Sequence, residues 1–356
     1  MNHMQQYLAE EFAEEYHAGH ISRRQALKML VALTGSVLLA GDFLAACAPP
    51  PLTATVAASS TGAASSTGAA SSTSAASAVP VSSTAVPDAS ATGVASANGT
   101  ASASGATGTA SATGAAGPAP YGTVMAGDPA IVAGPVTFAG GADTLLGYQA
   151  HPAAGGPFPV VLVCHENKGL TAHIQDVTRR LGKAGYAALA VDLLSRQGGS
   201  GQVGQSNAPG ALGGIAPGQF VADFQSGLAY MAAQTFAAAD RLGMVGFCFG
   251  GGVTWLMAEG VPALKAAVPF YGPPPPVDQV PKIQAAVLAM YGAADTRITS
   301  SEPGMAAAMQ QAGKVFDKMI YPGAGHAFFN DTGGSFNAEA AQDAWGKLLA
   351  WFGKYL

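Results

Sequence analysis

The last two thirds of the sequence predict an α/β fold, in which a doubly wound, mainly parallel sheet carries helices on both faces. Short apolar runs that end at Gly, Asn or Asp alternate with longer amphipathic segments, which is the pattern of strands joined by helices. Several runs are apolar at every position, as strands buried on both faces are. The first two runs are adjacent, so we expect an antiparallel pair at one edge of the sheet.

Eight apolar runs are the expected strands: Val136–Ala139, Leu145–Ala150, Val160–Cys164, Ala187–Val191, Leu242–Val245, Ala266–Tyr271, Ala285–Tyr291 and Val315–Tyr321. The expected helices lie between or after them: Thr171–Ala184, Gln219–Thr235, Gly251–Glu259, Pro303–Gln311 and Glu339–Tyr355. The first of these helices is indicated by Ile174, Val177 and Leu181, which share one face. The Gly-rich segment Gln197–Gly218 is either a flexible lid over a pocket or a tolerated surface loop.

Composition excludes two function classes. The chain has 16 Lys and Arg against 21 Asp and Glu, a formal charge of −5, and no basic cluster in its second half. A nucleic-acid binder needs such a cluster to neutralise phosphates, so we expect no nucleic-acid partner. The three cysteines, Cys47, Cys164 and Cys248, are too few for a disulfide framework and lack C-x-x-C spacing. We therefore expect no structural metal, and no cofactor is indicated.

The N-terminal region is similar to an export signal. The adjacent pair Arg23-Arg24 precedes an apolar run that ends at Gly41-Asp42, and this order resembles a twin-arginine signal. The run is shorter than the ~20 residues of a spanning helix. It is followed by Leu44-Ala45-Ala46-Cys47, which resembles a bacterial lipobox. We expect residues 1–47 to be a signal peptide, Cys47 to be lipidated, and the protein to be exported and lipid-anchored to the cell membrane.

A composition change separates this signal from the folded part. Residues 48–120 consist almost wholly of Ser, Thr, Ala, Gly and Pro, with Asp88 as their only charged side chain and no aromatic residue. Such small side chains bury too little apolar area to offset ~1–2 kcal/mol of backbone entropy per residue. The sequence predicts a disordered linker here and a folded domain over residues 121–356.

The strongest chemical signal is Gly246-Phe247-Cys248-Phe249-Gly250, between an expected strand and an expected helix. A G-x-C-x-G sequence there predicts a nucleophile elbow, because a cramped turn leaves no room for a Cβ two residues either side of the nucleophile. We expect the helix N-terminus to lower the pKa of the Cys248 thiol and to favour thiolate. A buried structural cysteine is the alternative interpretation.

Two further residues follow expected strands. Asp295 comes after Ala285–Tyr291, and His326 comes after Val315–Tyr321. The order Cys248, Asp295, His326 is the nucleophile, acid, base order of the α/β-hydrolase arrangement, so we expect that fold. His326 would accept the proton of the nucleophile, and Asp295 would fix the tautomer of His326.

The segment Cys164-His165-Glu166-Asn167-Lys168-Gly169 follows the first long apolar strand. In this fold that loop supplies one donor of the oxyanion hole, so we expect the backbone N–H groups of Asn167 and Phe249 to stabilise the oxyanion. Cys164 is expected to pack as a small apolar side chain, with a Cys164–Cys248 disulfide as the alternative. Another alternative is a metal site, whose ligands would be His165, Glu166, His173 and Asp176.

Taken together, these segments resemble the dienelactone hydrolase (carboxymethylenebutenolidase) family. The matching pieces are Cys164–Gly169, Val191–Arg196, Gly246–Gly251, Tyr291–Asp295 and Tyr321–Phe328. The resemblance implies that Glu166 interacts with the nucleophilic cysteine and helps to convert it to thiolate; the alternative is a surface ion pair with Lys168. It also implies a catalytic set of Cys248, His326, Asp295 and Glu166, and hydrolysis of small lactones or esters through a thioester.

The sequence defines the substrate less closely than it defines the catalytic residues. Family members that act on dienelactone bind its carboxylate with arginines, one of them four residues after the catalytic histidine, where this chain has Asn330. Dienelactone itself is therefore not the expected substrate. Arg196 is the candidate substrate-binding cation, and Arg297 and Lys168 are the other cations nearby in the sequence. The competing functions are a non-catalytic binding protein on the same fold and a thiol redox protein that uses Cys164 and Cys248.

Overall fold

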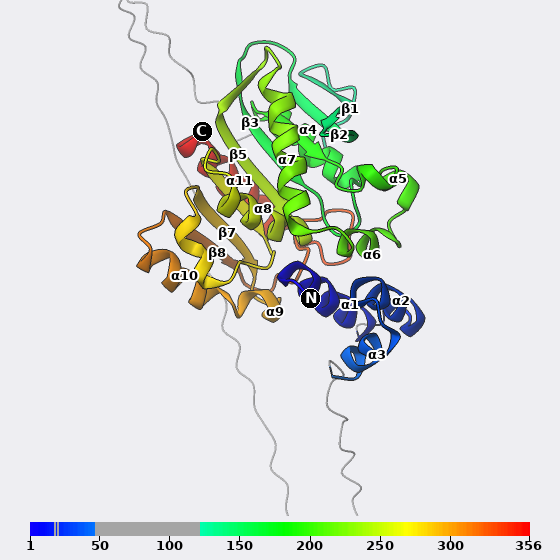
Figure 1. Ribbon diagram of the computed structural model, residues 1–356. Coiled ribbons are helices and arrows are strands. Elements are labelled where there is room, and N and C mark those ends of the chain that lie inside the picture. Colours follow the sequence, from blue (N-terminus) through cyan, green and yellow to red (C-terminus); the bar gives the residue numbers. More distant parts are fainter. Residues whose placement is uncertain (18, 20, 47–121) are drawn as a thin grey trace, which may run out of the picture. The chain divides into compact units, whose positions relative to one another are not determined.

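The computed structural model describes residues 1–17, 19, 21–46 and 122–356 (Figure 1). The predicted linker over residues 48–120 and the predicted lipidation site Cys47 lie outside these residues. Met1–Pro49 and Ala115–Leu356 belong to one compact unit, which holds both the N-terminal helices and the sheet.

An eight-stranded mixed sheet forms the centre of this unit, in the order β1-β2-β4-β3-β5-β6-β7-β8. β1 pairs with β2, and β2 with β4, in antiparallel fashion; every other neighbour is parallel. The strands are β1 (Ile131–Gly140), β2 (Asp143–Pro152), β3 (Phe158–Cys164), β4 (Ala187–Val191), β5 (Ala237–Phe247), β6 (Ala266–Phe270), β7 (Ala286–Gly292) and β8 (Phe316–Tyr321). The predicted α/β-hydrolase fold with its antiparallel edge pair is thus confirmed.

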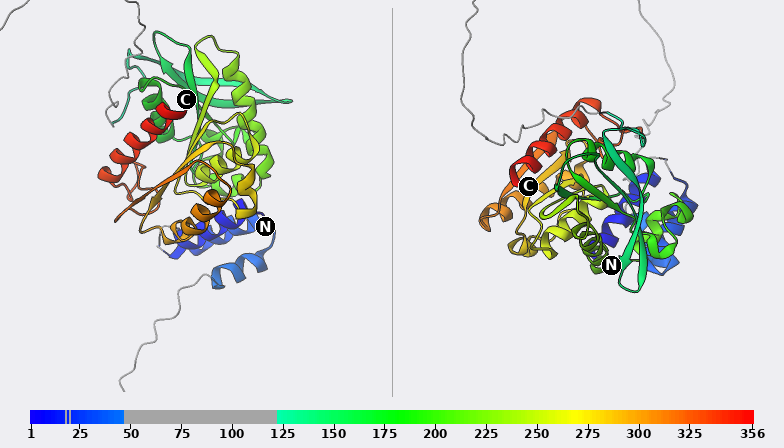
Figure 2. Two further views of the ribbon diagram at one scale, coloured as in Figure 1. Left: turned by 90° about the vertical axis from the view of Figure 1, so that its left-hand side faces the viewer. Right: turned by 90° about the horizontal axis from the view of Figure 1, so that it is seen from above.

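Helices cover both faces of the sheet (Figure 2). The main ones are α4 (Ala172–Lys183), α7 (Pro217–Ala232), α8 (Phe249–Gly260), α10 (Glu302–Gln311) and α11 (Ala338–Tyr355). α4 and α11 lie on one face, whereas α7 and α8 lie on the other. Every residue of β4, β6 and β7 is buried between these layers, which explains why their sequences are apolar throughout.

The segment 197–218, for which the sequence allowed either a flexible lid or a surface loop, folds mainly as short helical pieces. They are η1 (Ser195–Gln197), α5 (Ser200–Val203) and α6 (Ala208–Gly213). Ser200 fixes them to the end of β4, because its backbone N–H and its hydroxyl each donate to the Asp192 carboxylate at 2.7 Å. The same hydroxyl accepts from the backbone N–H of Leu170 at 2.8 Å. This anchoring holds α6 beside the carboxyl ends of the strands.

The N-terminal region forms three helices, α1 (His3–His17), α2 (Arg23–Thr34) and α3 (Val37–Ala46). α2 begins at the twin arginines, where Ser22 and Gln25 form a reciprocal capping box. Leu30, Leu33 and Leu44 are buried in the same apolar core as the sheet. Within the described part of the chain, no helix has the length and apolar character needed to cross a membrane.

Candidate active site

Cys248 lies on a strained turn between β5 and α8. Its φ of 57° and ψ of −122° place a non-glycine residue at positive φ, and its backbone N–H donates to the Phe270 carbonyl at 3.0 Å. Neighbouring backbone leaves no room for larger residues on either side. A Cβ on Gly246 would lie 2.1 Å from the Gly250 carbonyl oxygen, and a Cβ on Gly250 would lie 2.5 Å from that of His165. The chain therefore makes the sharp turn that the G-x-C-x-G sequence predicts.

We expect Gly250→Ala to disturb this turn. The added methyl group meets the carbonyls of His165 and Cys164, so α8 must move away from the end of β3, at a cost of about 1–3 kcal/mol in the free energy of unfolding. Urea unfolding and thiol alkylation rates would measure the loss of stability and the displacement of Cys248.

The matched control is Gly260→Ala at the other end of α8, where the nearest atom is 3.6 Å from the added Cβ. This variant should be as stable as the parent or slightly more stable. Equal stability of both variants would contradict the steric account.

Asp295 and His326 meet at the ends of β7 and β8. The Nδ1 atom of His326 lies 2.6 Å from Oδ2 of Asp295, whose side chain is 1% exposed. The other ring nitrogen, Nε2, is buried and makes no hydrogen bond to the residues that the structure describes. Cys248 Sγ and His326 offer atoms within 4.8 Å of each other. Three positions far apart in the sequence are thus brought together at the carboxyl ends of the parallel strands β5, β7 and β8.

The pKa of His326 reflects these neighbours. Burial alone would lower it, but the Cys248 thiol and the hydrogen bond to Asp295 raise the pKa of His326 well above its usual value. The Asp295 hydrogen bond and a thiolate at Cys248 therefore stabilise the imidazolium that forms when a histidine base accepts a thiol proton.

The N-terminal helix α1 contacts the thiol directly, a feature that the sequence analysis missed. The Tyr7 hydroxyl lies 3.2 Å from Cys248 Sγ, and Sγ–H donates to Oε1 of Glu11 at 3.3 Å. The Asn167 side-chain amide also donates to Glu11, at 2.8 Å. The only sequence signal was the helical spacing of Met4, Leu8 and Phe12 in a region assigned to export.

Because α1 covers Cys248, the pKa of its thiol differs from the predicted one. Burial raises the pKa of Cys248, and the Glu11 carboxylate raises it further, whereas His326 lowers it. The predicted lowering by the helix N-terminus is therefore wrong for this closed arrangement. The physical reason is that Cys248 is only 3% exposed and faces an anionic side chain.

Glu166 is buried at 4% exposure, which is incompatible with a surface ion pair to Lys168. Its Oε2 accepts from the Asn330 amide at 2.8 Å, while burial raises the pKa of the carboxyl group. Glu166 and Asn167 line one cavity of about 1140 Å³ together with Cys248, His326 and Asn330. Phe249, the other expected oxyanion residue, begins α8 directly after the nucleophile. The roles of Glu166, Asn167 and Phe249 stay predictions.

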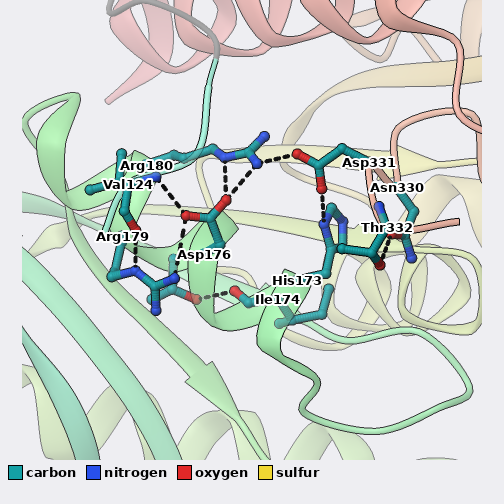
Figure 3. Close-up of polar contacts among 10 residues, drawn as sticks. Val124, His173, Ile174, Asp176, Arg179, Arg180, Asn330, Asp331 and Thr332 are labelled. Carbon is teal, nitrogen blue, oxygen red and sulfur yellow. Dashed lines mark hydrogen bonds and ion pairs between the residues drawn. The ribbon is translucent and has the colours of Figure 1, made fainter. Parts of the chain in front are cut away.

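A polar network supports the loop that carries Asn330 and Asp331 (Figure 3). His326 lies a few residues earlier in the same loop, after β8. Asp331 accepts from His173 at 2.9 Å and from Arg180, and Arg180 also donates to Asp176 at 2.8 Å. The hydrogen bonds from His173 and Arg180 hold the pKa of Asp331 below its usual range. Since α4 carries three of these residues, the network ties the histidine loop to α4.

The two arginines near the site, Arg196 and Arg297, form ion pairs. Arg196 donates to Asp223 at 2.7 Å and to Asp143 at 2.6 Å, and it is not among the cavity-lining residues. Its predicted contact with substrate stays untested by this arrangement. Arg297 instead approaches α1: its Nε donates to Glu14 at 3.0 Å, and its guanidinium lies 4.7 Å from the centre of the Tyr7 ring. Lys168 lines the cavity.

Cys164 and His165 are buried and contact neighbouring segments of the fold, as residues with a structural role do. Cys164 is fully buried at the end of β3, and both Cys164 and Cys248 are free thiols. His165 connects two loops, because its Nδ1 lies 2.7 Å from the Glu166 carbonyl and its Nε2 accepts from the Leu193 backbone N–H at 3.2 Å. The side-chain atoms of the alternative metal ligands His165, Glu166, His173 and Asp176 thus have separate hydrogen-bond partners.

An eight-stranded sheet of this order, with a nucleophile elbow after β5, defines the α/β-hydrolase class. The Dienelactone hydrolase family matches residues 145–356, and the chain belongs to that family. It is a dienelactone hydrolase-like hydrolase.

Individual proteins agree with this assignment. A protein of Methylorubrum extorquens AM1 named "Putative carboxymethylenebutenolidase" is 41% identical over 221 residues, which cover 58% of this chain and 76% of that protein. A protein of the same name from Escherichia coli K12 is 36% identical, over 65% of this chain and 90% of its own length. A crystal structure named "Putative Dienelactone Hydrolase" from Klebsiella pneumoniae superposes with a TM-score of 0.60 and is 36% identical in sequence. The match covers 64% of this chain and 100% of that chain.

Proposed function

We propose that this chain hydrolyses small lactones or carboxylic esters through Cys248, His326 and Asp295, with a thioester intermediate. The observation that carries the proposal is the 2.6 Å contact between His326 Nδ1 and Asp295, with the second ring nitrogen of His326 unbonded and the Cys248 thiol within 4.8 Å of the imidazole. A nucleophile, a base and an orienting carboxylate in this order are what acyl transfer requires.

In the proposed mechanism, His326 Nε2 accepts the Sγ proton of Cys248, and the thiolate forms a bond to the carbonyl carbon. The carbonyl electron pair moves onto oxygen, which the backbone N–H groups of Asn167 and Phe249 stabilise. As the carbonyl re-forms, the C–O bond to the leaving alkoxide or enolate breaks, and imidazolium supplies the proton. His326 then accepts a proton from water as the hydroxide adds to the thioester carbonyl; the C–S bond breaks to release the acid, and the imidazolium returns its proton to sulfur. Asp295 fixes the tautomer throughout.

Asn330 and the family support a proposal for the substrate class. Neutral Asn330 bonds Glu166 at the position where dienelactone-specific members have arginine, so we propose small esters and lactones other than dienelactone. The test is hydrolysis of 4-nitrophenyl acetate and a panel of γ-lactones under reducing conditions. Because Tyr7 and Glu11 cover the thiol, the full chain is assayed both unchanged and as Tyr7→Ala/Glu11→Ala. A folded protein inert in both forms toward every ester and lactone would overturn the proposal.

We further propose that the protein is exported by the twin-arginine route and anchored through a lipid on Cys47. Replacing Arg23 and Arg24 by lysine should keep the precursor inside the cell, because that route reads the arginine pair. Cys47→Ala should release the protein from the membrane fraction, since the acyl chains are lost. Cell fractionation checks both, and an unchanged distribution of both variants would contradict the proposal.

A further inference from the structure

Helix α1 lies over the nucleophile with its side chains in the place of a substrate. Tyr7 and Glu11 are 2% and 6% exposed, and Cys248 beneath them is 3% exposed. An ester carbonyl must come within ~3–3.5 Å of the attacking atom. The Tyr7 oxygen at 3.2 Å and the Glu11 carboxylate at 3.3 Å from Sγ already occupy that shell.

An apolar face holds α1 in this place. Met4, Leu8 and Phe12 are nearly fully buried, and full burial of each such side chain contributes about 1.5–3 kcal/mol. The Met4 thioether packs against Gly252 in the first turn of α8, and Leu8 packs near Gly213 of α6. An isolated helix of 15 residues is marginal in water, so α1 depends on this docking to stay folded.

Charge complementarity adds a polar part to the docking surface. α1 carries four glutamates, which are Glu10, Glu11, Glu14 and Glu15, and it has no lysine or arginine. Arg297, two residues after Asp295, pairs with Glu14 at 3.0 Å and lies 3.6 Å from Glu11. The Asn167 amide donates to Glu11 from the other side of the cleft at 2.8 Å. The acidic helix therefore fits the cationic and amide groups around the thiol.

The contacts also oppose the first chemical step. The Sγ–H group donates to Glu11 at 3.3 Å and the Tyr7 hydroxyl lies 3.2 Å from Sγ, so the Glu11 contact stabilises the protonated thiol. An anion at Glu11 disfavours thiolate, and it would equally disfavour a negative charge on the carbonyl oxygen of a substrate.

From these contacts we propose that α1 is an inhibitory segment: it forms one wall of the cavity beside Cys248, its Tyr7 and Glu11 side chains hold the attack position at Sγ, and it must move before a substrate carbonyl can reach the thiol. This inference rests on the proposed function, in which Cys248 is the nucleophile. If the chain is cleaved before Cys47, the segment leaves with the signal, and hydrolysis is confined to the processed protein.

The test measures access to Cys248 separately from hydrolysis. Full-length protein is treated with iodoacetamide, and peptide mapping follows Cys248 apart from Cys47 and Cys164. Two variants open the site in different ways: Tyr7→Ala/Glu11→Ala removes the contacts, and Leu8→Asp/Phe12→Asp undocks the helix. We expect both to raise the alkylation rate of Cys248 at least about tenfold, because the open fraction sets the observed rate. Ester hydrolysis should rise in parallel.

The matched control is Glu10→Gln, whose carboxylate bonds Gln6 on the exposed side of α1; it should alkylate and hydrolyse like the parent. A synthetic peptide of residues 1–21, added to the undocked variant, should slow both reactions again. The same peptide with Tyr7→Ala and Glu11→Ala should have a weaker effect. Thermal melts check that each variant is folded.

Unchanged alkylation in both opened variants would overturn the inhibitory role. Turnover that falls while alkylation rises would overturn it too, because α1 would then complete the substrate site. If alkylation rises as expected but no variant hydrolyses any ester or lactone, α1 still covers the thiol and it is the proposed hydrolysis that fails.

Discussion

Cys248→Ala is expected to lower kcat/KM for 4-nitrophenyl acetate by at least about 10³-fold, because loss of the nucleophile leaves only the binding and oxyanion contributions. The fold should survive. The Cβ of alanine is no larger than that of cysteine at the φ of 57°, and the hydrogen bonds that Sγ makes to Tyr7 and Glu11 go to α1. The measurement is steady-state hydrolysis in the Tyr7→Ala/Glu11→Ala background, with thermal melts to confirm folding.

Cys164→Ala is the matched control, since it removes the other buried thiol of the domain. Cys164 lies at the end of β3 and is a free thiol, so its loss should cost a little stability and leave turnover within a few-fold of the parent. Equal loss of activity in both variants would indicate thiol redox chemistry, which requires both sulfurs. Undiminished activity in Cys248→Ala would remove Cys248 from the mechanism.

The second large effect is expected from Asp295→Asn, with a loss of about 10²–10⁴-fold in kcat. An asparagine amide donates where the carboxylate accepts, so His326 would lose its proton from Nδ1 and carry it on Nε2. That tautomer cannot accept the Sγ proton. The Asp295 hydrogen bond also helps to raise the pKa of His326, so its removal weakens the imidazolium formed in the reaction.

Asparagine keeps the size of the side chain and its ability to cap α9 (Thr296–Thr299), so the loss should appear in kcat with little change in KM or stability. Asp143→Asn is the control, because this exposed carboxylate pairs with Arg196 at the sheet edge, away from His326. A kcat within threefold of the parent for Asp295→Asn would contradict the proposed orienting role.

The sequence predicted the sheet well because its signals are local. Runs such as Val160–Cys164 and Ala187–Val191 are apolar on both faces, and burial on both faces is what the structure has. β5 begins earlier than predicted. Its first half contains the polar pair Asp240-Arg241 and is only partly buried, so the apolar pattern that predicts a strand starts at Leu242. Glycine spacing likewise predicted the turn at Cys248, since the steric conflict arises within five residues.

The cover over the site could not be predicted in this way. The spacing of Met4, Leu8 and Phe12 indicates an amphipathic helix, but it does not say which surface the helix contacts. The partners of Glu11 are Asn167 and Cys248, which lie more than 150 residues away. The thiol pKa depends on burial and on that distant contact, so the helix N-terminus alone could not give the direction of its shift.

The central claim is that Cys248 carries the acyl group during turnover. The most direct test mixes the Tyr7→Ala/Glu11→Ala protein with 4-nitrophenyl acetate, quenches in acid within one turnover, and maps the acetylated peptide by mass spectrometry. The account predicts a thioester on the Cys248 peptide that forms as nitrophenolate is released and disappears as substrate is exhausted. Steady hydrolysis with no acyl group on Cys248 at any time, or with the group on another residue at the turnover rate, would contradict it.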